Sequence, residues 1–363
     1  MLHSVPRPDS VVLPFSPPAD FSTLRTAHPA LAMRAAQGSL FRSLPWFENL
    51  HAHGLERERS NDTLRLPADA GGCLPLLDDG RCMRALANYY SSVYGPIGSL
   101  PPSLAAAIKE SKPALVDLHP LDPCTPEFQQ IKQALAEAGY WVDDYFCFGN
   151  WHLAVEGRSW PAYLAGRPSQ LRSNIQRGSG KLDKAGTWNI HIQQGADTAL
   201  ETAIAAFVGV YAKSWKDEEP QPEFIPHLCR TAAREGWLRL GVLRLDGAPI
   251  AAQLWLTHGG VASIYKLAYA EEAARYSAGT VLTAAMFEHA LDVDRVGEVD
   301  YLNGDEPYKR DWMSHRRERR GIIAFDLSQW SGLTAALRHW AGRALRSLQA
   351  QGRNTRQSRP RET

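Results

Sequence analysis

The feature that most constrains the fold is a long run of β-strand signals from Trp237 to Ala270, which reads "WLRLGVLRLDGAPIAAQLWLTHGGVASIYKLAYA". Two glycine-containing pairs interrupt this run, Asp246-Gly247 and Gly259-Gly260. Pairs of this kind adopt the positive φ angles that two-residue hairpin turns need. The run therefore predicts three consecutive strands joined by tight turns, which is an antiparallel meander.

Helical and strand-like patterns surround this meander. A predicted strand at 188–195 and an amphipathic helix at 196–216 precede it. A predicted helix at 277–293 and strands at 298–304 and 319–326 follow it. This order is typical of an α+β fold, a mixed α/β layer with a largely antiparallel sheet.

The first half of the chain repeats the same rhythm. We expect a hairpin around "AGG" at 70–72, a buried strand at 113–121 and a further strand from Trp141. The clearest helix is "TPEFQQIKQALAEAGY", with Thr125 at its start and Gly139 at its end. The sequence contains neither GxGxxG nor GxxxxGK[ST], which argues against a doubly wound nucleotide-binding fold.

Length and charge narrow the class of protein. The chain has 363 residues, enough for two domains of ordinary size, with a formal net charge of +1 and a pI of about 7.7. A general nucleic-acid binder would usually be strongly basic. No apolar run of the length that spans a bilayer exists, so we expect no transmembrane helix. The proline-containing N-terminus lacks the pattern of a signal peptide, and residues 1–37 are predicted to form a poorly ordered leader.

The cysteines and histidines give no sign of a metal site. The five cysteines are scattered and form no CxxC pair, which is typical of reduced thiols in a cytoplasmic protein. The closest histidine pair, "HAH" at His51 to His53, has no cysteine or carboxylate at metal-ligand spacing. We therefore expect no metal cofactor.

The densest group of chemically active side chains lies at Asp300 to Trp312, "DYLNGDEPYKRDW". It follows a predicted strand and brings carboxylates, tyrosines, a lysine and a tryptophan together around Gly304. A surface loop with charge pairs and one core tryptophan is the alternative interpretation. The density of these groups after a buried-looking strand favours a function for the segment.

The meander, the small-residue loop after it and "DYLNGDEPYKRDW" together resemble the CelD-type (Fem-related) branch of the GNAT acyltransferases. The resemblance covers roughly residues 160–325 and includes the basic helix "QLRSNIQRGSGKL". Fem-type proteins carry two GNAT-like units in one chain. The resemblance thus implies tandem units at 38–159 and 160–327, followed at 328–363 by a basic amphipathic helix and a disordered tail.

The resemblance also implies a place for an acyl-CoA donor. In GNAT enzymes a Gly-rich turn before a helix binds the coenzyme A pyrophosphate with backbone N–H groups and the helix N-terminus. The matching loop here is "RYSAGTVL", in which Arg275, Ser277, Ala278, Gly279 and Thr280 would contact the donor. Ala278 and Thr280 stand where the family pattern has glycine, so an ordinary strand-to-helix turn is the alternative.

By the same resemblance, the segment after Gly304 would carry the chemistry. Acyl transfer needs a base, a donor for the developing oxyanion and groups that orient the acceptor. Asp305 and Glu306 are the candidate bases or orienting carboxylates, and Tyr308 is a candidate acid or oxyanion donor. Lys309 would bind an anionic part of the substrate, and Trp312 would form an apolar or sugar-stacking wall.

Further candidates lie outside that segment. Tyr265 and Lys266 belong to the last strand of the meander, where alternation would direct one toward the site and the other away from it. Arg172 and Arg177 on the basic helix would meet an anionic acceptor or donor, or would simply be solvated. His152 follows a strand of the first unit, where a lone histidine is more often structural.

Three functional hypotheses remain open at this stage. The leading one is a cytoplasmic acyl-CoA-dependent transferase, such as an acetyltransferase, that acts on an amine or hydroxyl of a sugar, polysaccharide or cell-envelope precursor. The second is a Fem-like transferase whose donor is an aminoacyl-tRNA. The third is a non-catalytic GNAT-like scaffold in polysaccharide assembly. The terminal helix either docks on the domain, which we favour, or makes peripheral contact with a membrane.

Overall fold

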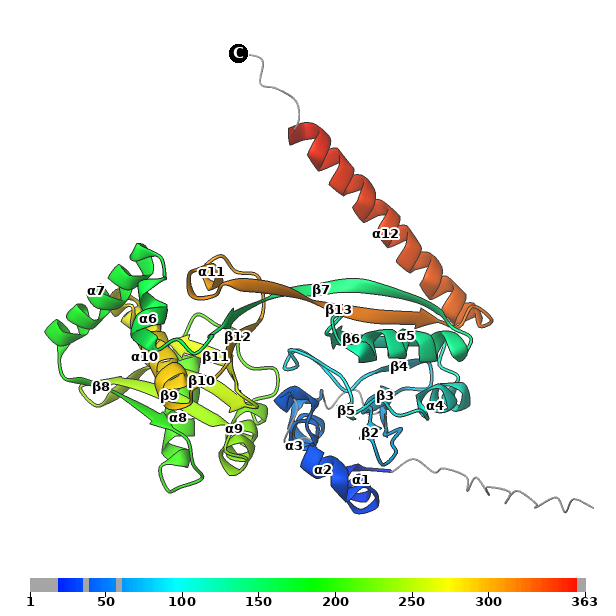
Figure 1. The fold of residues 1–363 in the computed structure, drawn as a ribbon, viewed down its shortest axis with the longest axis horizontal. Helices are drawn as coiled ribbons and strands as arrows, with labels where there is room; N and C mark the ends of the chain where they lie inside the picture. The colour runs from blue at the N-terminus through cyan, green and yellow to red at the C-terminus, as the bar shows by residue number, and fades with distance from the viewer. Residues whose placement is uncertain (1–18, 35–38, 57–60, 358–363) are drawn as a thin grey trace, which may run out of the picture.

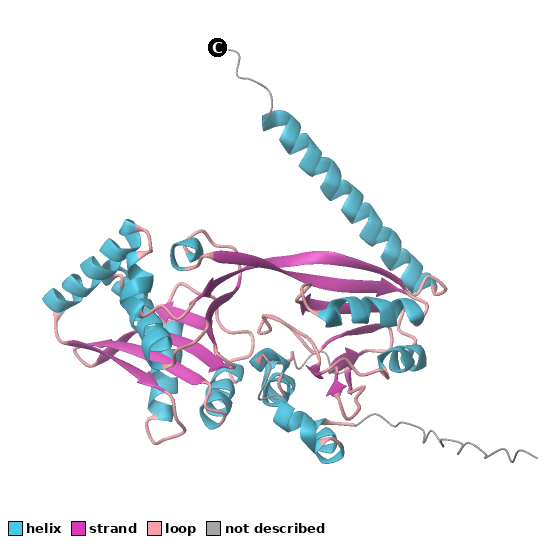
Figure 2. Cartoon of the chain, in the orientation of Figure 1, coloured by secondary structure: helices cyan, strands magenta, loops and turns pink. Residues whose placement is uncertain are grey.

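The computed structural model describes residues 19–34, 39–56 and 61–357. Its main feature is one continuous eleven-stranded sheet that runs through both halves of the molecule (Figure 1, Figure 2). Neighbouring strands in the described sheet are antiparallel except for two parallel pairs, β4 (Cys82–Ala85) with β6 (Leu115–Leu121) and β11 (Val261–Tyr269) with β12 (Glu298–Asn303). The predicted α+β fold with a largely antiparallel sheet is confirmed.

The order of strands across the sheet differs from their order along the chain. The remaining members are β1 (Thr63–Arg65), β3 (Leu76–Asp78), β7 (Trp141–Ala154), β8 (Trp188–Gln193), β9 (Leu238–Leu245), β10 (Ala248–His258) and β13 (His315–Phe325). Across the sheet the order is β1, β3, β4, β6, β13, β7, β12, β11, β10, β9, β8. Two short strands, β2 (Gly72–Cys73) and β5 (Ile97–Gly98), form a separate ladder.

Helices cover both faces of the sheet in the second half of the chain, where α6, α7 and α10 share one apolar core and α8 and α9 belong to the other. The helices are α1 (Phe21–Ala27), α2 (Pro29–Arg34), α3 (Leu44–Asn49), α4 (Leu104–Ser111), α5 (Pro126–Glu137), α6 (Trp160–Ala165), α7 (Ser169–Ala185), α8 (Leu200–Ala212), α9 (Phe224–Arg234), α10 (Ala278–Glu288), α11 (Lys309–Trp312) and α12 (Trp330–Gln357). The core that contains α8 and α9 continues into the first half through α3.

Two long strands join the halves. β7 from the first half pairs with β12 of the second, with Asp300 opposite His152. β13 from the end of the second half pairs with β6 of the first, with Ile322 opposite Leu118. β7 and β13 also pair with each other from Trp141 opposite Phe325 onward. The segments predicted as two units therefore share one sheet, and each contributes a strand beside the other.

The meander has the predicted form. β9, β10 and β11 pair as consecutive antiparallel strands. Asp246 and Gly247 have φ angles of +50° and +81°, and Gly259 and Gly260 have φ angles of +57° and +77°. Positive φ at both central residues is the geometry of the two-residue turns that match the twist of a hairpin, so the two turns fix the register of the site strand β11.

The N-terminal prediction needs correction. Residues 19–34 of the predicted leader form α1 and α2, and Phe21, Leu24 and Leu31 are buried. The Asp20 carboxylate accepts a hydrogen bond from the Thr23 N–H and caps α1, which is the usual signal of a helix start. The rest of the predicted leader, residues 1–18 and 35–37, lies outside the described residues.

Two helices also differ from expectation. No element was predicted between the end of α8 and the meander, yet α9 lies there with Phe224, Leu228 and Ala232 buried against the sheet. α12 continues to Gln357, beyond the point where the sequence predicted a disordered tail; residues 358–363 lie outside the described residues. Among the helices described, none has the length and hydropathy needed to span a bilayer.

Candidate active site

The site is built on an opening in the sheet between two parallel strands. β11 and β12 pair over only three residues, Val261 with Glu298 to Ser263 with Asp300. Beyond Ser263 the strands separate, so the edge of β11 that faces β12 has no strand partner there among the residues that the structure describes. Unpaired strand edges present backbone N–H and C=O groups that can bind an extended amide-containing ligand.

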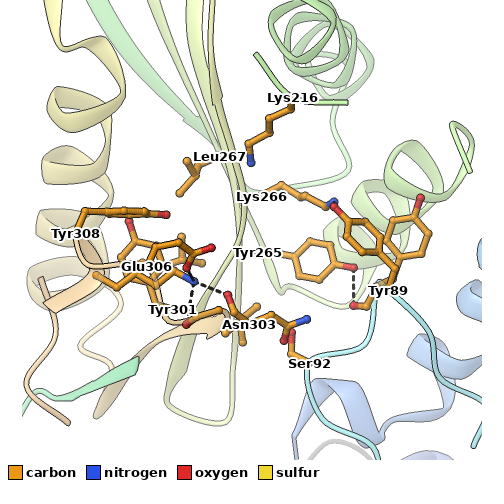
Figure 3. A pocket seen from close by; sticks show the side chains of 15 residues that line it. Tyr89, Ser92, Lys216, Tyr265, Lys266, Leu267, Tyr301, Asn303, Glu306 and Tyr308 are labelled. Carbon is orange, nitrogen blue, oxygen red and sulfur yellow. Dashed lines mark hydrogen bonds and ion pairs between the residues drawn. The ribbon is translucent and has the colours of Figure 1, made fainter. Parts of the chain in front are cut away.

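A cavity of about 330 Å³ occupies this opening (Figure 3). Residues from both halves of the chain line it, together with the segment that follows β12. They are Tyr89, Tyr90, Ser92, Lys216, Ile264, Tyr265, Lys266, Leu267, Tyr301, Leu302, Asn303, Gly304, Glu306, Tyr308 and Lys309. The predicted segment after Asp300 therefore does border a cavity, and three lysines converge on it.

A β-bulge changes the direction of two predicted side chains. In the pairing of β11 with β10, Lys266 lies opposite Leu254 and Ile264 lies opposite Trp255, which leaves Tyr265 as the extra residue. An extra residue breaks the alternation of a strand. Tyr265 and Lys266 consequently both extend toward Tyr89 (Figure 3), and the expectation that they face opposite sides is wrong.

Both of these side chains contact the first half of the chain, through Tyr89 and Tyr90. The Tyr265 hydroxyl donates to the Tyr90 carbonyl at 2.9 Å. The Lys266 ammonium is buried, pairs with Glu219 at 2.6 Å and lies 4.4 Å from the centre of the Tyr89 ring. Because its charge is neutralised in this way, Lys266 fixes the wall of the cavity and is a poor candidate for a substrate ligand.

Lys216 is the cavity lysine without such a partner. Its ammonium lies over the rings of Tyr211 and Trp215, and it has no ion pair within the part of the chain that the structure describes. Burial is the main cause that lowers the pKa of Lys216, and the positive charge of Lys266 is the second; the pKa is about 8. A lysine with this pKa can lose its proton near neutral pH, which makes it a candidate base.

The end of β12 is held in a strained conformation by a buried carboxylate. Leu302 has a φ angle of +55°, which is unfavourable for a branched aliphatic residue. The Asp300 carboxylate accepts from the Leu302 N–H at 2.7 Å and also from the Asn150 amide and the Arg317 guanidinium. This network fixes the path of Tyr301 to Gly304 past the cavity.

The loop after β12 places three predicted residues at the cavity. The Lys309 ammonium is buried, binds the carbonyls of Asn303 and Gly304 and pairs with Glu306 at 2.8 Å. Burial is the largest influence on the Glu306 carboxyl and raises its pKa, but the hydrogen bond from Lys309, a backbone hydrogen bond and the charges of Lys309 and Lys216 together lower the pKa below its ordinary value. Burial raises the pKa of Tyr308 to about 12, so its hydroxyl stays protonated and can donate.

Two other residues of this segment point away from the cavity. The Asp305 carboxylate accepts from the Trp151 indole at 2.7 Å and pairs with Arg316 at 2.6 Å, so it fastens the loop to β7 and β13. Trp312 is buried and stacks on Phe287 at 4.9 Å, which does not fit the predicted exposed substrate wall. The short helix α11 turns Trp312 inward, where burial of a large ring is favourable.

The predicted acyl-CoA loop forms the start of α10. Ser277 occupies the N-cap position in the left-handed region, with φ +54°, and its side chain makes no capping hydrogen bond. The N–H groups of Ala278, Gly279 and Thr280 meet no acceptor among the described residues. Gly279 is required by close packing, since a Cβ there would lie 2.9 Å from the Tyr269 ring. The first turn of α10 is thus available for an anion, and its glycine serves the fold as well.

Two cationic side chains lie beside this helix start. Arg275 is exposed and stacks on the Tyr276 ring at 4.7 Å. Lys181 of α7 donates to the Arg275 carbonyl at 2.8 Å. The N–H groups and cations at this helix start therefore form a donor set that fits phosphate groups. The Tyr269 ring lies beside Gly279, and Tyr269 follows the cavity residue Leu267 by two positions on β11.

The remaining candidates are placed apart from the cavity. Arg172 and Arg177 are exposed on α7 and bond to atoms of their own neighbourhood, the Ala165 carbonyl and the Asn174 side chain. His152 lies on β7 with its ring 5.4 Å from that of His315. None of these three lines the cavity.

A second cavity of about 360 Å³ adjoins the first, since Ser92 and Leu302 line both. Its lining is dominated by paired polar groups. Arg319 pairs with Asp122 at 2.6 Å, and Arg317 pairs with Glu298 at 2.7 Å. Such a surface offers many fixed hydrogen-bond donors and acceptors with little net charge.

Comparison with protein families identifies the part of the chain that carries this site. Residues 169–310 match the family model described as "Acetyltransferase (GNAT) domain". These residues form a GNAT-type acyltransferase domain. A comparison with curated proteins found no match. The CelD-type branch is not distinguished by the model that matches.

Solved structures with a similar fold extend over most of the chain. The C-terminal domain (DUF2156) of a protein assigned as a lysylphosphatidylglycerol synthetase from Agrobacterium fabrum aligns with a TM-score of 0.56 and 13% identity, covering 84% of this chain and 92% of that one. FemX aligns with a TM-score of 0.54 and 10% identity, covering 82% and 95%. A conserved protein from Bacteroides thetaiotaomicron aligns with a TM-score of 0.55 and 9% identity, covering 83% and 97%. At these identities the likeness concerns the fold alone.

Sequence reasoning missed several residues that line the candidate site. Lys216 lies in a loop after α8, and Tyr89, Tyr90 and Ser92 come from the first half of the chain. The sequence features that could have pointed to these residues are a lysine after a tryptophan in "SWK" and two adjacent tyrosines in "NYYSS". Only the long-range packing brings them to the opening between β11 and β12.

In the described part of the chain, no group of three or more histidine, cysteine or carboxylate side chains is placed to hold a metal ion. All five cysteines are free thiols. His53 of the "HAH" motif stacks on His227, with ring centres 3.6 Å apart.

Proposed function

We propose that the chain is an acyl-CoA-dependent N- or O-acyltransferase whose acyl thioester lies in the opening between β11 and β12. The observations that carry this proposal are the unpaired edge of β11 at the cavity and the N–H groups at the start of α10 that meet no acceptor among the described residues. An acyl-CoA has the complementary order of groups: an acyl thioester, two amides and then phosphates. The matching GNAT domain spans both features.

The two ends of the donor would meet different parts of the domain. The amides would bond to the open backbone edge of β11 by strand addition. The phosphates would meet the first turn of α10 with Arg275 and Lys181 beside it. Ser277, Ala278, Gly279 and Thr280 would act mainly through their backbone, which explains why the loop tolerates residues other than glycine.

The proposed reaction is direct attack of an acceptor amine or hydroxyl on the thioester carbon. The new C–N or C–O bond forms as the C–S bond breaks, the acceptor gives up one proton, and the thiolate takes one. We assign the base to the neutral form of Lys216 and the proton or hydrogen-bond donor to Tyr308. Glu306 and Lys309 hold the loop that presents Tyr308.

A sugar, polysaccharide or other envelope precursor remains the proposed acceptor. The adjoining cavity supports this choice, because its paired carboxylates, guanidinium groups and Asn150 could exchange hydrogen bonds with several hydroxyls. Leu302 and Ser92, which border both cavities, lie where such an acceptor would approach the thioester.

The proposal is tested by titrating the protein with acetyl-CoA and longer acyl-CoAs in a calorimeter and by following release of coenzyme A thiol in the presence of amino sugars. Binding of at least one acyl-CoA is expected. Absence of binding to well-folded protein would overturn the proposal.

The role of Lys216 has a separate test. With its pKa of about 8, the rate should rise with pH and level off above that value, because only the neutral amine accepts a proton. Lys216→Met should retain acyl-CoA binding and lose roughly a hundredfold in kcat, together with this pH dependence. Lys213→Met, at an exposed position of the same loop, is the matched control and should leave both unchanged.

A Fem-like transfer from aminoacyl-tRNA is the second candidate. It is favoured by the carboxylate of Glu306 at the cavity, which could hold the ammonium group of an aminoacyl donor, and by a fold shared with FemX and a lysylphosphatidylglycerol synthetase domain. Transfer from aminoacyl-tRNA with steep salt dependence, and none from acyl-CoA, would favour it. If neither donor binds, the scaffold hypothesis stands.

A further inference from the structure

The terminal helix α12 docks through its first turns and then leaves the body of the molecule (Figure 1). Ala336 is buried, and the Trp340 ring meets Trp141 edge-on at 4.9 Å. The His339 imidazole lies 2.8 Å from the Asp143 carboxylate, which also pairs with Arg343. These contacts use one face of the helix and fix where it starts.

A different face of the same turns is apolar and exposed. Trp330 is 79% exposed and Leu337 is 53% exposed. Ala341 is exposed as well. Intervals of seven and four residues place these three side chains in one stripe along a helix, away from Ala336 and Trp340. The sequence continues the same interval with Leu348.

The charged side chains of α12 are all of one sign. From Trp330 to Gln357 the sequence has five arginines and no aspartate or glutamate. Because the whole chain carries +1, the remaining residues together carry −4. Arg338 is exposed beside Leu337 and has no ion pair among the described residues. The sequence of the helix adds Arg346, Arg353 and Arg356 after it. The apolar stripe is thus flanked by positive charge.

We infer that α12 binds an anionic lipid surface, with its apolar stripe in the interface and the exposed Arg338 at the headgroups. An apolar stripe bordered by basic residues on a helix of low overall hydrophobicity is the pattern of helices that lie in the plane of a membrane. This inference does not depend on the proposed acyl transfer.

The charge and the apolar stripe of α12 together favour an anionic bilayer over a second copy of the helix or a nucleic acid. A second copy of α12 would bring two sets of arginines together without any acidic residue to compensate them. A nucleic acid would satisfy the arginines but would leave Trp330 and Leu337 without an apolar environment. An anionic bilayer satisfies both the stripe and its flank, while the net negative charge of the rest of the chain keeps the body away from the surface.

The test is flotation of the full chain with vesicles of phosphatidylcholine and phosphatidylglycerol, compared with vesicles of phosphatidylcholine alone. Binding is expected only to the anionic vesicles and should weaken as salt is added. Leu337→Asp should lower the partition coefficient about tenfold or more, and Arg338→Glu should lower it about tenfold.

Matched controls separate the helix from general surface effects. Val208→Asp changes another exposed apolar residue, 45% exposed on α8, and Arg81→Glu changes an exposed arginine of the β3–β4 turn. Both controls should bind like the unmodified chain. The inference is overturned if the protein does not float with anionic vesicles at low salt, or if the controls lose as much binding as the α12 variants. A change in molar mass caused by Leu337→Asp would likewise overturn it, because the stripe would then join two copies.

Discussion

The described sheet contains two pairs of parallel strands that separate after three paired residues. The gap between the strands is covered by another segment of the chain in one pair and is uncovered in the other. In the first half, β4 and β6 run parallel for three residues, Cys82 with Leu115 to Arg84 with Asp117. In the second half, β11 and β12 do the same, ending with Ser263 and Asp300. In both cases the connection contains a helix, α4 or α10. The two halves therefore offer the same geometric starting point for a binding site.

The first opening is filled by the chain itself. After β4, residues 86–96 pass across it, and the Tyr94 N–H bonds to the Pro120 carbonyl at the end of β6. Tyr90 and Tyr94 are buried, and the Tyr94 hydroxyl donates to the Pro75 carbonyl at 2.7 Å. In the second half a short 3-10 turn, Glu271–Tyr276, leads directly to α10 and leaves the opening free.

The segment that fills the opening of the first half also lines the cavity at the opening of the second half. Tyr89, Tyr90 and Ser92 belong to the segment that fills the first half, and they line the cavity of the second. The two halves therefore differ: the segment that fills the opening of the first half also forms part of the cavity wall in the second. The comparison can be tested by variants that affect the two openings differently.

The largest effect is expected for Tyr90→Ala. Tyr90 is buried, stacks on Phe224 at 4.0 Å and accepts from the Gln221 N–H, so its removal leaves a cavity where the halves meet. We expect a loss of about 3–5 kcal/mol in the free energy of unfolding, measured by urea titration. Tyr89, 63% exposed, is the matched control, and Tyr89→Ala should cost about 1 kcal/mol or less. Equal losses for the two variants would contradict the shared-wall interpretation.

A smaller effect is expected at the last paired residue of each opening. Asp300→Asn would place an amide against the Leu302 N–H and the Asn150 amide and remove a partner of Arg317. We expect it to cost about 2–3 kcal/mol and to lower acyl-CoA turnover, because the strained end of β12 is released. Asp117, its counterpart, accepts a hydrogen bond from the Tyr145 hydroxyl; Asp117→Asn should cost about 1 kcal/mol. Urea unfolding titrations of both variants measure these losses, and equal losses would contradict a difference between the two strand ends.

The smallest effects concern the two connecting helices. Ser277 before α10 and Lys112 after α4 both have positive φ, +54° and +48°. Glycine relieves this strain, so Ser277→Gly and Lys112→Gly should each raise stability by about 0.5 kcal/mol, seen as a higher Tm. If the donor meets only the backbone of the α10 loop, both variants should also keep the acyl-CoA affinity unchanged. A weaker affinity in Ser277→Gly alone would show that the Ser277 hydroxyl contacts the donor.

Local patterns in the sequence predicted the frame of the site. The glycine pairs at 246–247 and 259–260 specify their turns through backbone conformation alone, so the meander could be read directly. The strand end at Asp300 and the loop that follows could also be located, because a buried strand followed by dense polar groups is a local signal. This signal located the segment whose residues Glu306, Tyr308 and Lys309 line the cavity.

What could not be predicted depends on contacts between distant segments. The bulge at Tyr265 is visible only in its pairing with β10, and alternation alone gave the wrong side. Asp305 and Trp312 have suitable chemistry, but Arg316 and Phe287 draw them away from the cavity. Lys216 and the tyrosines at 89 and 90 reach the site through tertiary packing, which no local periodicity encodes.

The position of β13 has a consequence for the synthesis of the chain. β6 and β7 are neighbours in sequence, yet β13, His315–Phe325, lies between them in the sheet. During translation the nascent first half therefore presents two unpaired strand edges until β13 has left the ribosome. Such edges can pair with other chains. The order of synthesis thus makes the first half dependent on a late segment, and a chain interrupted before His315 would be prone to aggregate.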